Sequence, residues 1–344
     1  MSHPNEPWQR GLAGTLHEHW IESDLLRDNR LGDPYRRPLW VYTPPGYDDG
    51  ADDYPAIYVI QGMTGQLDMW RNRTPFRPTF PELLDRDFDM GTIRPCLVCF
   101  VDCWTSLGGS QFLDSPATGR YHSYLCEEVV SFVDARYRTK PAAAHRAITG
   151  KSSGGYGAMV TPMLRPDLFG ALATHAGDAL FEQCYGRDFG PAVRALRDEY
   201  GGSWAAFLQD FRDRPALTKP TDALLLNMYA MAACYSADPD GTVRFPFDLE
   251  TAELVPEIWD WWLHWDPVRM AQNERYAEAL KGLRAVYVDA GKHDEYYLDV
   301  GAEAFVKALR KLGLEPHFEL FDGGHGGIEY RYPLAIRYLA GHIR

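Results

Sequence analysis

The chain has 344 residues, of which 45% are hydrophobic and 24% are charged, and its formal net charge is −13. These values are typical of a soluble protein with one large domain or two modest ones, and no segment approaches the roughly 18 apolar residues of a membrane span. The negative charge argues against a nucleic-acid partner, because nucleic-acid binding requires a basic surface.

The opening residues, MSHPNEPWQRGLAG, have neither the basic nor the apolar region of an export signal, so we expect a cytoplasmic protein. Six cysteines in a chain of this length are too sparse for a disulfide framework. Cys96, Cys99 and Cys103 are closely spaced, but they lie in an apolar run typical of a buried strand, whose alternate side chains face opposite ways. We therefore expect no metal site there.

The N-terminal part alternates apolar and polar residues in 15–21 and 38–44, a pattern that predicts antiparallel edge strands. Short apolar runs further along predict strands that are buried on both faces, as in a parallel sheet. These runs are 56–60, 96–102, 146–150, 171–177, 284–291 and 317–324. Helical patterns separate them at 122–137, 153–164 and 299–313. The sequence predicts an α/β fold with a mostly parallel central sheet and helices on both faces.

The stretch 178–282 is much longer than one crossover helix and contains several helical patterns without a convincing strand. We expect a single domain over 1–344, in which 178–282 is a helical cap inserted over one end of the sheet. The tryptophans of 255–267, Trp262 among them, either pack this cap on the core or form an aromatic wall for a substrate.

The segment 148–159, ITGKSSGGYGAM, allows two interpretations. A phosphate-binding loop of the form G-x-x-x-x-G-K-[ST] requires glycine at position 145, where this chain has His145. The second interpretation is a G-x-S-x-G turn between a strand and a helix, which presents a serine nucleophile. Both flanking elements are predicted here, and the glycines single out Ser152 as the nucleophile.

A serine nucleophile requires a base and an acid that orients the base. His325 follows the last predicted strand within DGGHGG, where glycines leave its imidazole room to reach the serine. Asp294 follows the preceding strand in the loop KHDEYYL and is the best-placed acid. The other carboxylates considered for this role are Asp178, Asp289, Glu295 and Asp299.

Acyl transfer also requires two N–H donors for the developing oxyanion. The amide of Ser153 follows the nucleophile, and Gly62 in the loop QGMTGQ allows a turn that exposes the amide of Met63. Gln61, Trp104 and Trp262 are candidates for the substrate pocket. Lys151 is either a solvated side chain or a contact to an anionic substrate, and the sequence does not decide between them.

Six stretches together resemble the putative-esterase family of α/β-hydrolases, which includes S-formylglutathione hydrolases, enterochelin esterases, feruloyl esterases and mycolyltransferases. They are PLWVYTPPGY, AIYVIQGMTG, CLVCFVDCW, ITGKSSGGYGAM, AGKHDEYYL and FDGGHGG. The resemblance implies Ser152 as nucleophile, Asp294 as acid, His325 as base, and Met63 and Ser153 as oxyanion donors. The chain departs from the family at Gln61, where many members have histidine, and at Ser153, where relatives often have Met, Phe or Leu.

We therefore expect a serine esterase that cleaves a small-molecule carboxylic ester or thioester through an acyl-enzyme, without a metal or organic cofactor. Two alternatives stay open, an acyltransferase on the same fold and a non-catalytic binding protein on a hydrolase scaffold. The sequence leaves the acyl group, the leaving group and any homo-oligomer undetermined.

Overall fold

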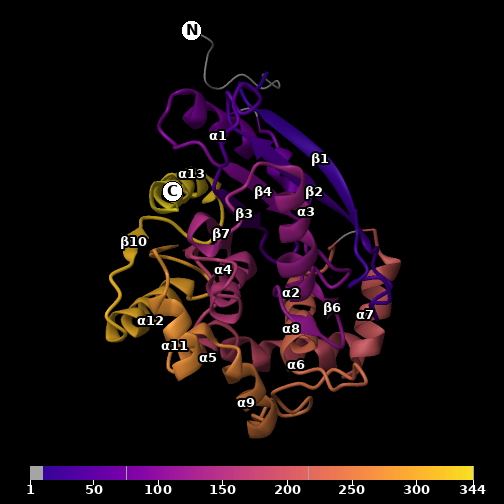
Figure 1. The fold of residues 1–344 in the computed structure, drawn as a ribbon. Helices are drawn as coiled ribbons and strands as arrows, with labels where there is room; N and C mark the ends of the chain where they lie inside the picture. The colour runs from indigo at the N-terminus through magenta and orange to yellow at the C-terminus, as the bar shows by residue number, and fades with distance from the viewer. Residues whose placement is uncertain (1–10, 75, 216, 344) are drawn as a thin grey trace.

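The computed structural model describes residues 11–343 except positions 75 and 216, and it centres on one eight-stranded sheet (Figure 1). The strand order is β1-β2-β4-β3-β7-β8-β9-β10. The strands are β1 (Thr15–Glu22), β2 (Arg36–Thr43), β3 (Ala56–Ile60), β4 (Leu97–Val101), β7 (Arg146–Lys151), β8 (Ala171–His175), β9 (Ala285–Gly291) and β10 (His317–Phe321). A separate short hairpin joins β5 (Asp114–Ser115) to β6 (Gly119–Arg120).

The sheet is antiparallel at the edge that β1 and β2 form and parallel elsewhere. β1 pairs with β2, and β2 with β4, in antiparallel register. All pairings from β4 across to β10 are parallel. This arrangement confirms the predicted α/β class, and each predicted strand run coincides with a strand to within a few residues. Because parallel strands end at the same edge, the loops after β3, β7, β8, β9 and β10 come together there.

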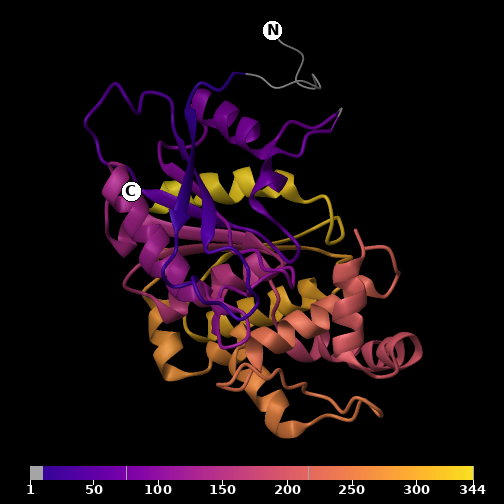
Figure 2. The same cartoon turned by 90° about the vertical axis from the view of Figure 1, so that its right-hand side faces the viewer.

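Helices cover both faces of the sheet (Figures 1 and 2). On one face, α1 (Phe80–Asp89) and α13 (Tyr332–His342) enclose an apolar cluster that includes Trp70, Phe100 and Ile336. On the other face lie α2 (Tyr121–Ser123), η2 (Tyr124–Val129), α3 (Val130–Arg136), α4 (Ser153–Leu164) and α12 (Leu298–Lys311). Strand β4 separates the two clusters, because Val98 packs in the first and Cys99 in the second.

Helix α4 is buried on almost every side, from Ser153 to Met163. A helix that is apolar all round, as GYGAMVTPML is, has no solvent face to form. One side of α4 packs on β7 and β8, and its other neighbours are α10 (Pro267–Met270) and α11 (Glu274–Lys281). The helix that follows the serine turn is therefore enclosed, which holds its N-terminus in one position.

Between β8 and β9, the described residues form helices and isolated bridges but no strand. Besides α10 and α11, the helices are α5 (Phe181–Cys184), α6 (Phe189–Tyr200), α7 (Trp204–Asp213), α8 (Asp222–Tyr235) and α9 (Pro256–His264). Their apolar side chains, such as Phe207 and Trp262, belong to the same buried cluster as the α4 face of the sheet. Figure 2 shows this segment as a further layer beyond α4 and α12. No helix among the described residues is long and apolar enough to cross a membrane.

A substitution at Gly150 tests how closely the turn between β7 and α4 is packed. A Cβ atom at Gly150 would overlap the backbone of Gly154, whereas a Cβ at Gly190 in α6 would meet nothing within 4 Å. We expect Gly150→Ala to lower the free energy of unfolding by about 1–3 kcal/mol or more, because neither backbone can move aside. Denaturant unfolding measures this difference.

Gly190→Ala is the matched control. It adds the same methyl group to an open position in a helix, where alanine is favoured over glycine by up to about 1 kcal/mol. We expect this variant to be at least as stable as the parent protein. Equal stability of the two variants would contradict the close packing of Gly150 against Gly154.

Candidate active site

Ser152 lies on a strained turn between β7 and α4. Its backbone has φ 57° and ψ −126°, a conformation that costs a residue with a side chain of order 1–3 kcal/mol. Two backbone hydrogen bonds hold the turn, from Ser152 N to the His175 carbonyl (3.0 Å) and from Tyr156 N to the Ser152 carbonyl (2.8 Å). The strain is thus maintained by the neighbouring strand β8 and by the first turn of α4.

The loop after β3 passes directly against this turn at Gly62. A Cβ atom there would lie 3.0 Å from the Lys151 carbonyl oxygen and 3.3 Å from Ser152 Cβ, so a side chain at this position would displace the loop. The loop is held by hydrogen bonds from Thr64 N to the Gly108 carbonyl (2.8 Å) and from Gly65 N to the Gly62 carbonyl (3.0 Å). Within the described residues, no acceptor is found for the amide of Met63, which lies between these anchors.

The amide of Ser153 is at the first position of α4, where a helix leaves its N–H groups without partners inside the helix. The positive end of the helix dipole points in the same direction. Met63 and Ser153 both line the cavity that contains Ser152. The two residues therefore reach the cavity beside Ser152 from two different elements, the loop after β3 and the start of α4.

His325 and Asp294 come together from the loops after β10 and β9. His325 Nδ1 lies 2.8 Å from Asp294 Oδ2, and the carboxylate is fully buried while 15% of the imidazole is exposed. The amide of Tyr296 donates to Asp294 Oδ1 at 2.9 Å. The amide of His325 donates to Glu295 at 2.8 Å, and the ring of Tyr296 packs edge-on against the imidazole. Both loops are therefore held by contacts to each other.

Ser152 and His325 open into one cavity of about 750 Å³, within the range of pockets that bind small molecules. Its wall includes the loop after β3, the serine turn, the loops after β9 and β10, and the segment 178–282. Apolar side chains from that segment supply one side of the wall. They are Leu217, Pro220, Ala223, Leu224 and Leu226.

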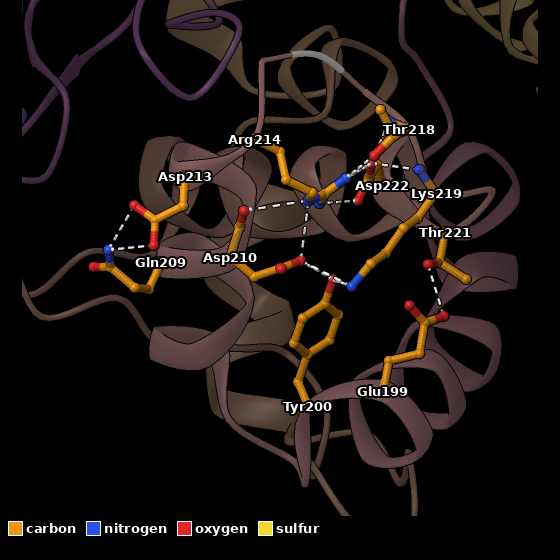
Figure 3. A network of polar contacts seen from close by, with 10 residues as sticks. All are labelled: Glu199, Tyr200, Gln209, Asp210, Asp213, Arg214, Thr218, Lys219, Thr221 and Asp222. Carbon is orange, nitrogen blue, oxygen red and sulfur yellow. Dashed lines mark hydrogen bonds and ion pairs between the residues drawn. The ribbon is translucent and has the colours of Figure 1, made fainter.

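An ion-pair network holds this apolar side in place (Figure 3). Arg214 binds both oxygens of Asp222, at 2.6 and 2.7 Å, and its hydrogen bonds lower the pKa of that carboxyl. Asp210 accepts from Lys219 (2.8 Å) and from Tyr200 (2.9 Å). These contacts tie the end of α7 to the start of α8, close in sequence to Leu217 and Pro220, which line the cavity.

A second histidine–aspartate pair lies beneath the serine turn. His175 Nδ1 is 2.6 Å from Asp289 Oδ1, and Arg331 and Tyr287 donate to Asp289 Oδ2 at 2.9 and 3.0 Å. Burial acts to raise the pKa of Asp289, but the neighbouring His175 and Arg331 outweigh it, so that this pKa is lowered. Both partners are fully buried and neither lines the cavity, so this pair supports β8 and β9 from inside.

Asp178, the first alternative acid, has other partners. Its carboxylate accepts from Tyr185 (2.7 Å), Gln111 (3.1 Å) and Ser153 Oγ (3.3 Å). Burial raises its pKa, against the effect of these hydrogen bonds. Asp294 is thus the carboxylate that the structure places on His325, while Asp178 lies at the base of the cavity beside Ser153.

Three residues predicted for the substrate pocket do not line the cavity that contains Ser152. Gln61 is buried with its amide against the end of β4. Trp104 lines a separate pocket with Arg37 and Asp102. Trp262 is fully buried, donates to Ser236 Oγ at 2.8 Å and packs edge-on against Tyr185. Trp262 therefore supports a cavity residue from behind, because helix α9 turns its indole inward.

Tyr185, Tyr296, Asn72 and Asn227 line the cavity, and the sequence had no signal for them. They come from four segments that no motif connects, so only the packing of these segments on one another brings them together. Lys151 also lines the cavity. The described residues contain no group of three or more His, Cys, Asp or Glu side chains arranged to hold a metal ion.

Comparison with known proteins identifies the family of this chain. Residues 34–334 match the model of the Esterase family, described as "Putative esterase". A ferulic acid esterase superposes with a TM-score of 0.61 at 17% identity, over 97% of this chain and 100% of that chain. The S-formylglutathione hydrolase from Agrobacterium tumefaciens superposes with a TM-score of 0.57 at 15% identity, over 98% of both chains.

A fluorophosphonate-binding serine hydrolase F from Staphylococcus aureus superposes with a TM-score of 0.57 at 13% identity, over 95% of this chain and 98% of that chain. At these low identities the superpositions show a shared fold. The family assignment rests on the family model, which covers most of the sequence. The chain belongs to the Esterase family of carboxylic ester hydrolases and has their α/β-hydrolase fold.

Proposed function

We propose that Ser152, His325 and Asp294 form a catalytic triad that hydrolyses a small-molecule carboxylic ester or thioester through an acyl-enzyme. The observation that carries this proposal is the 2.8 Å contact between His325 and Asp294 at the wall of the cavity into which Ser152 opens. A histidine whose Nδ1 is held by a buried carboxylate presents Nε2 as the base. The strained turn keeps the serine hydroxyl at the cavity surface.

In the first half of the reaction, Ser152 Oγ attacks the carbonyl carbon and His325 Nε2 takes the hydroxyl proton. The tetrahedral intermediate collapses as the bond to the leaving group breaks, and His325 returns the proton to the departing alcohol or thiol. Water then attacks the acyl-enzyme with His325 again as base. The second tetrahedral intermediate collapses as the bond to Ser152 Oγ breaks, His325 returns the proton to Ser152, and the acid leaves. Asp294 holds the imidazole and stabilises the imidazolium in both halves.

The amides of Met63 and Ser153 would stabilise the oxyanion of each tetrahedral intermediate. Support comes from the presence of both residues in the lining of the cavity that contains Ser152, and from the absence of an acceptor for Met63 N among residues 11–343 as described. Because such donors are fixed before the reaction, they stabilise the developing charge without reorganisation. The side chains at positions 63 and 153 are not required for this role.

The leucines of the segment 178–282 would receive an apolar acyl or aryl group. Leu217, Leu224 and Leu226 line the cavity, and the network around Arg214 links the elements that carry them. The names of the solved relatives include esterases of ferulic acid and a hydrolase of S-formylglutathione, so both oxygen and sulfur esters are substrates to test.

The nucleophile is tested with a pair of adjacent serines. We expect Ser152→Ala to abolish both the hydrolysis of 4-nitrophenyl esters and labelling by a fluorophosphonate probe, because the neighbouring Ser153 hydroxyl donates to Asp178 rather than to a histidine base. Ser153→Ala keeps the backbone amide and loses one hydrogen bond to Asp178. It should retain labelling and most of the activity. Labelling of the Ser152→Ala protein would move the nucleophile to another residue.

The acid is tested with the two histidine–aspartate pairs. Asp294→Asn should lower kcat by about 10⁴-fold, because an amide favours the wrong imidazole tautomer. Asp289→Asn is the control, since it alters a pair that does not reach the cavity. We expect it to lower the unfolding temperature while the folded protein keeps far more activity than Asp294→Asn. The reverse order of activities would contradict the proposed triad.

A further inference from the structure

Lys151 is a half-buried cation next to the nucleophile. It is the last residue of β7, directly before Ser152, and its side chain lines the same cavity as Ser152 and His325. Among the residues that the structure describes, its ammonium group has neither a hydrogen bond nor an ion pair. A lysine that packs only for structural reasons at such a site would ordinarily reach a carboxylate or a carbonyl group.

Three carboxylates act on Lys151 from a distance, but each has another partner. Glu329 pairs with Arg77 at 3.1 Å. Asp294 holds the imidazole of His325, and Glu295 accepts from the His325 amide at 2.8 Å. Burial lowers the pKa of Lys151, and these three carboxylates oppose that effect. The ammonium group is thus partly removed from water without a direct counter-ion.

A second cation, Arg187, also lines the cavity, but its guanidinium group already has partners. Arg187 donates to the Glu295 carbonyl at 2.6 Å, lies 3.4 Å from Asp188 and packs over the ring of Tyr297. Of the Lys and Arg side chains that line the cavity in the described part of the chain, Lys151 is therefore the one that is free to bind a ligand. The protein as a whole carries a net charge of −13, which repels anions, so binding one requires a local positive group.

We propose that Lys151 binds a carboxylate of the substrate, so that the enzyme prefers esters in which a carboxylate lies a few bonds from the scissile carbonyl. This inference rests on the proposed function, because it places the carboxylate in relation to Ser152. The carboxylate can belong to the acyl group or to the leaving group. In both cases it would form an ion pair with Lys151 while the carbonyl lies between Ser152 and the oxyanion donors.

The test compares each carboxylate substrate with its own methyl ester, which keeps the shape and removes the charge. Mono-4-nitrophenyl glutarate and methyl 4-nitrophenyl glutarate report a carboxylate on the acyl side. 4-Acetoxybenzoate and methyl 4-acetoxybenzoate report one on the leaving-group side. The values of kcat/KM are measured for the parent protein, Lys151→Met, Lys151→Arg and Lys307→Met.

We expect Lys151→Met to lower kcat/KM for the carboxylate member of at least one pair by about 10- to 100-fold, the usual range for a hydrogen bond to a charged group. The methyl ester of that pair should change much less. Lys151→Arg keeps a cation and should retain most of the preference for the carboxylate. Lys307, exposed on α12, provides the control, because Lys307→Met removes one positive charge at a position outside the cavity.

Two results would overturn the inference. An equal loss on both members of each pair would show that Lys151 supports the turn rather than the substrate's charge, and unchanged values on all four substrates would show that it contacts neither. Failure of the proposed function would look different. In that case Ser152→Ala would keep the activity of the parent protein on the neutral esters, whatever Lys151→Met does.

Discussion

The backbone of Ser152, at φ 57°, is the constraint on which the rest of the site depends. Neither Gly150 nor Gly154 has room for a Cβ atom, because one at Gly150 would overlap the Gly154 backbone and one at Gly154 would overlap the backbone of Ile60 and Gln61 at the end of β3. The turn also brings Gly62 against Ser152, so that the loop after β3 ends beside the serine. Strain at one residue is therefore maintained by the packing of three elements.

The two histidine–aspartate pairs show how the same side chains serve different roles. His175 and Asp289 lie within strands β8 and β9, and Arg331 and Tyr287 complete their hydrogen bonds in the interior. Asp294 and His325 lie in the loops just beyond β9 and β10, and one face of the imidazole reaches the cavity. Burial removes the first pair from chemistry, whereas position at the sheet edge makes the second available.

The segment 178–282 lines one part of the cavity without supplying any of the three proposed catalytic side chains. Its interior is continuous with one face of the sheet, and the contacts of Arg214 and Lys219 hold its cavity-facing turn. A wall built in this way can vary in sequence while the reacting groups stay on the sheet loops. Relatives with 13–17% identity share this fold, and a common fold leaves the ligand to be set by the residues of the site.

The sequence alone determined the order of strands and helices and the serine turn, and it favoured Asp294 over Asp178 as the acid beside His325, because each depends on a local pattern or on chain order. Its three candidates for the substrate pocket, Gln61, Trp104 and Trp262, do not line the cavity that contains Ser152. The tertiary structure decided which side chains from distant segments share the cavity. Such neighbours depend on how helices rotate and pack, and no spacing within one segment encodes that.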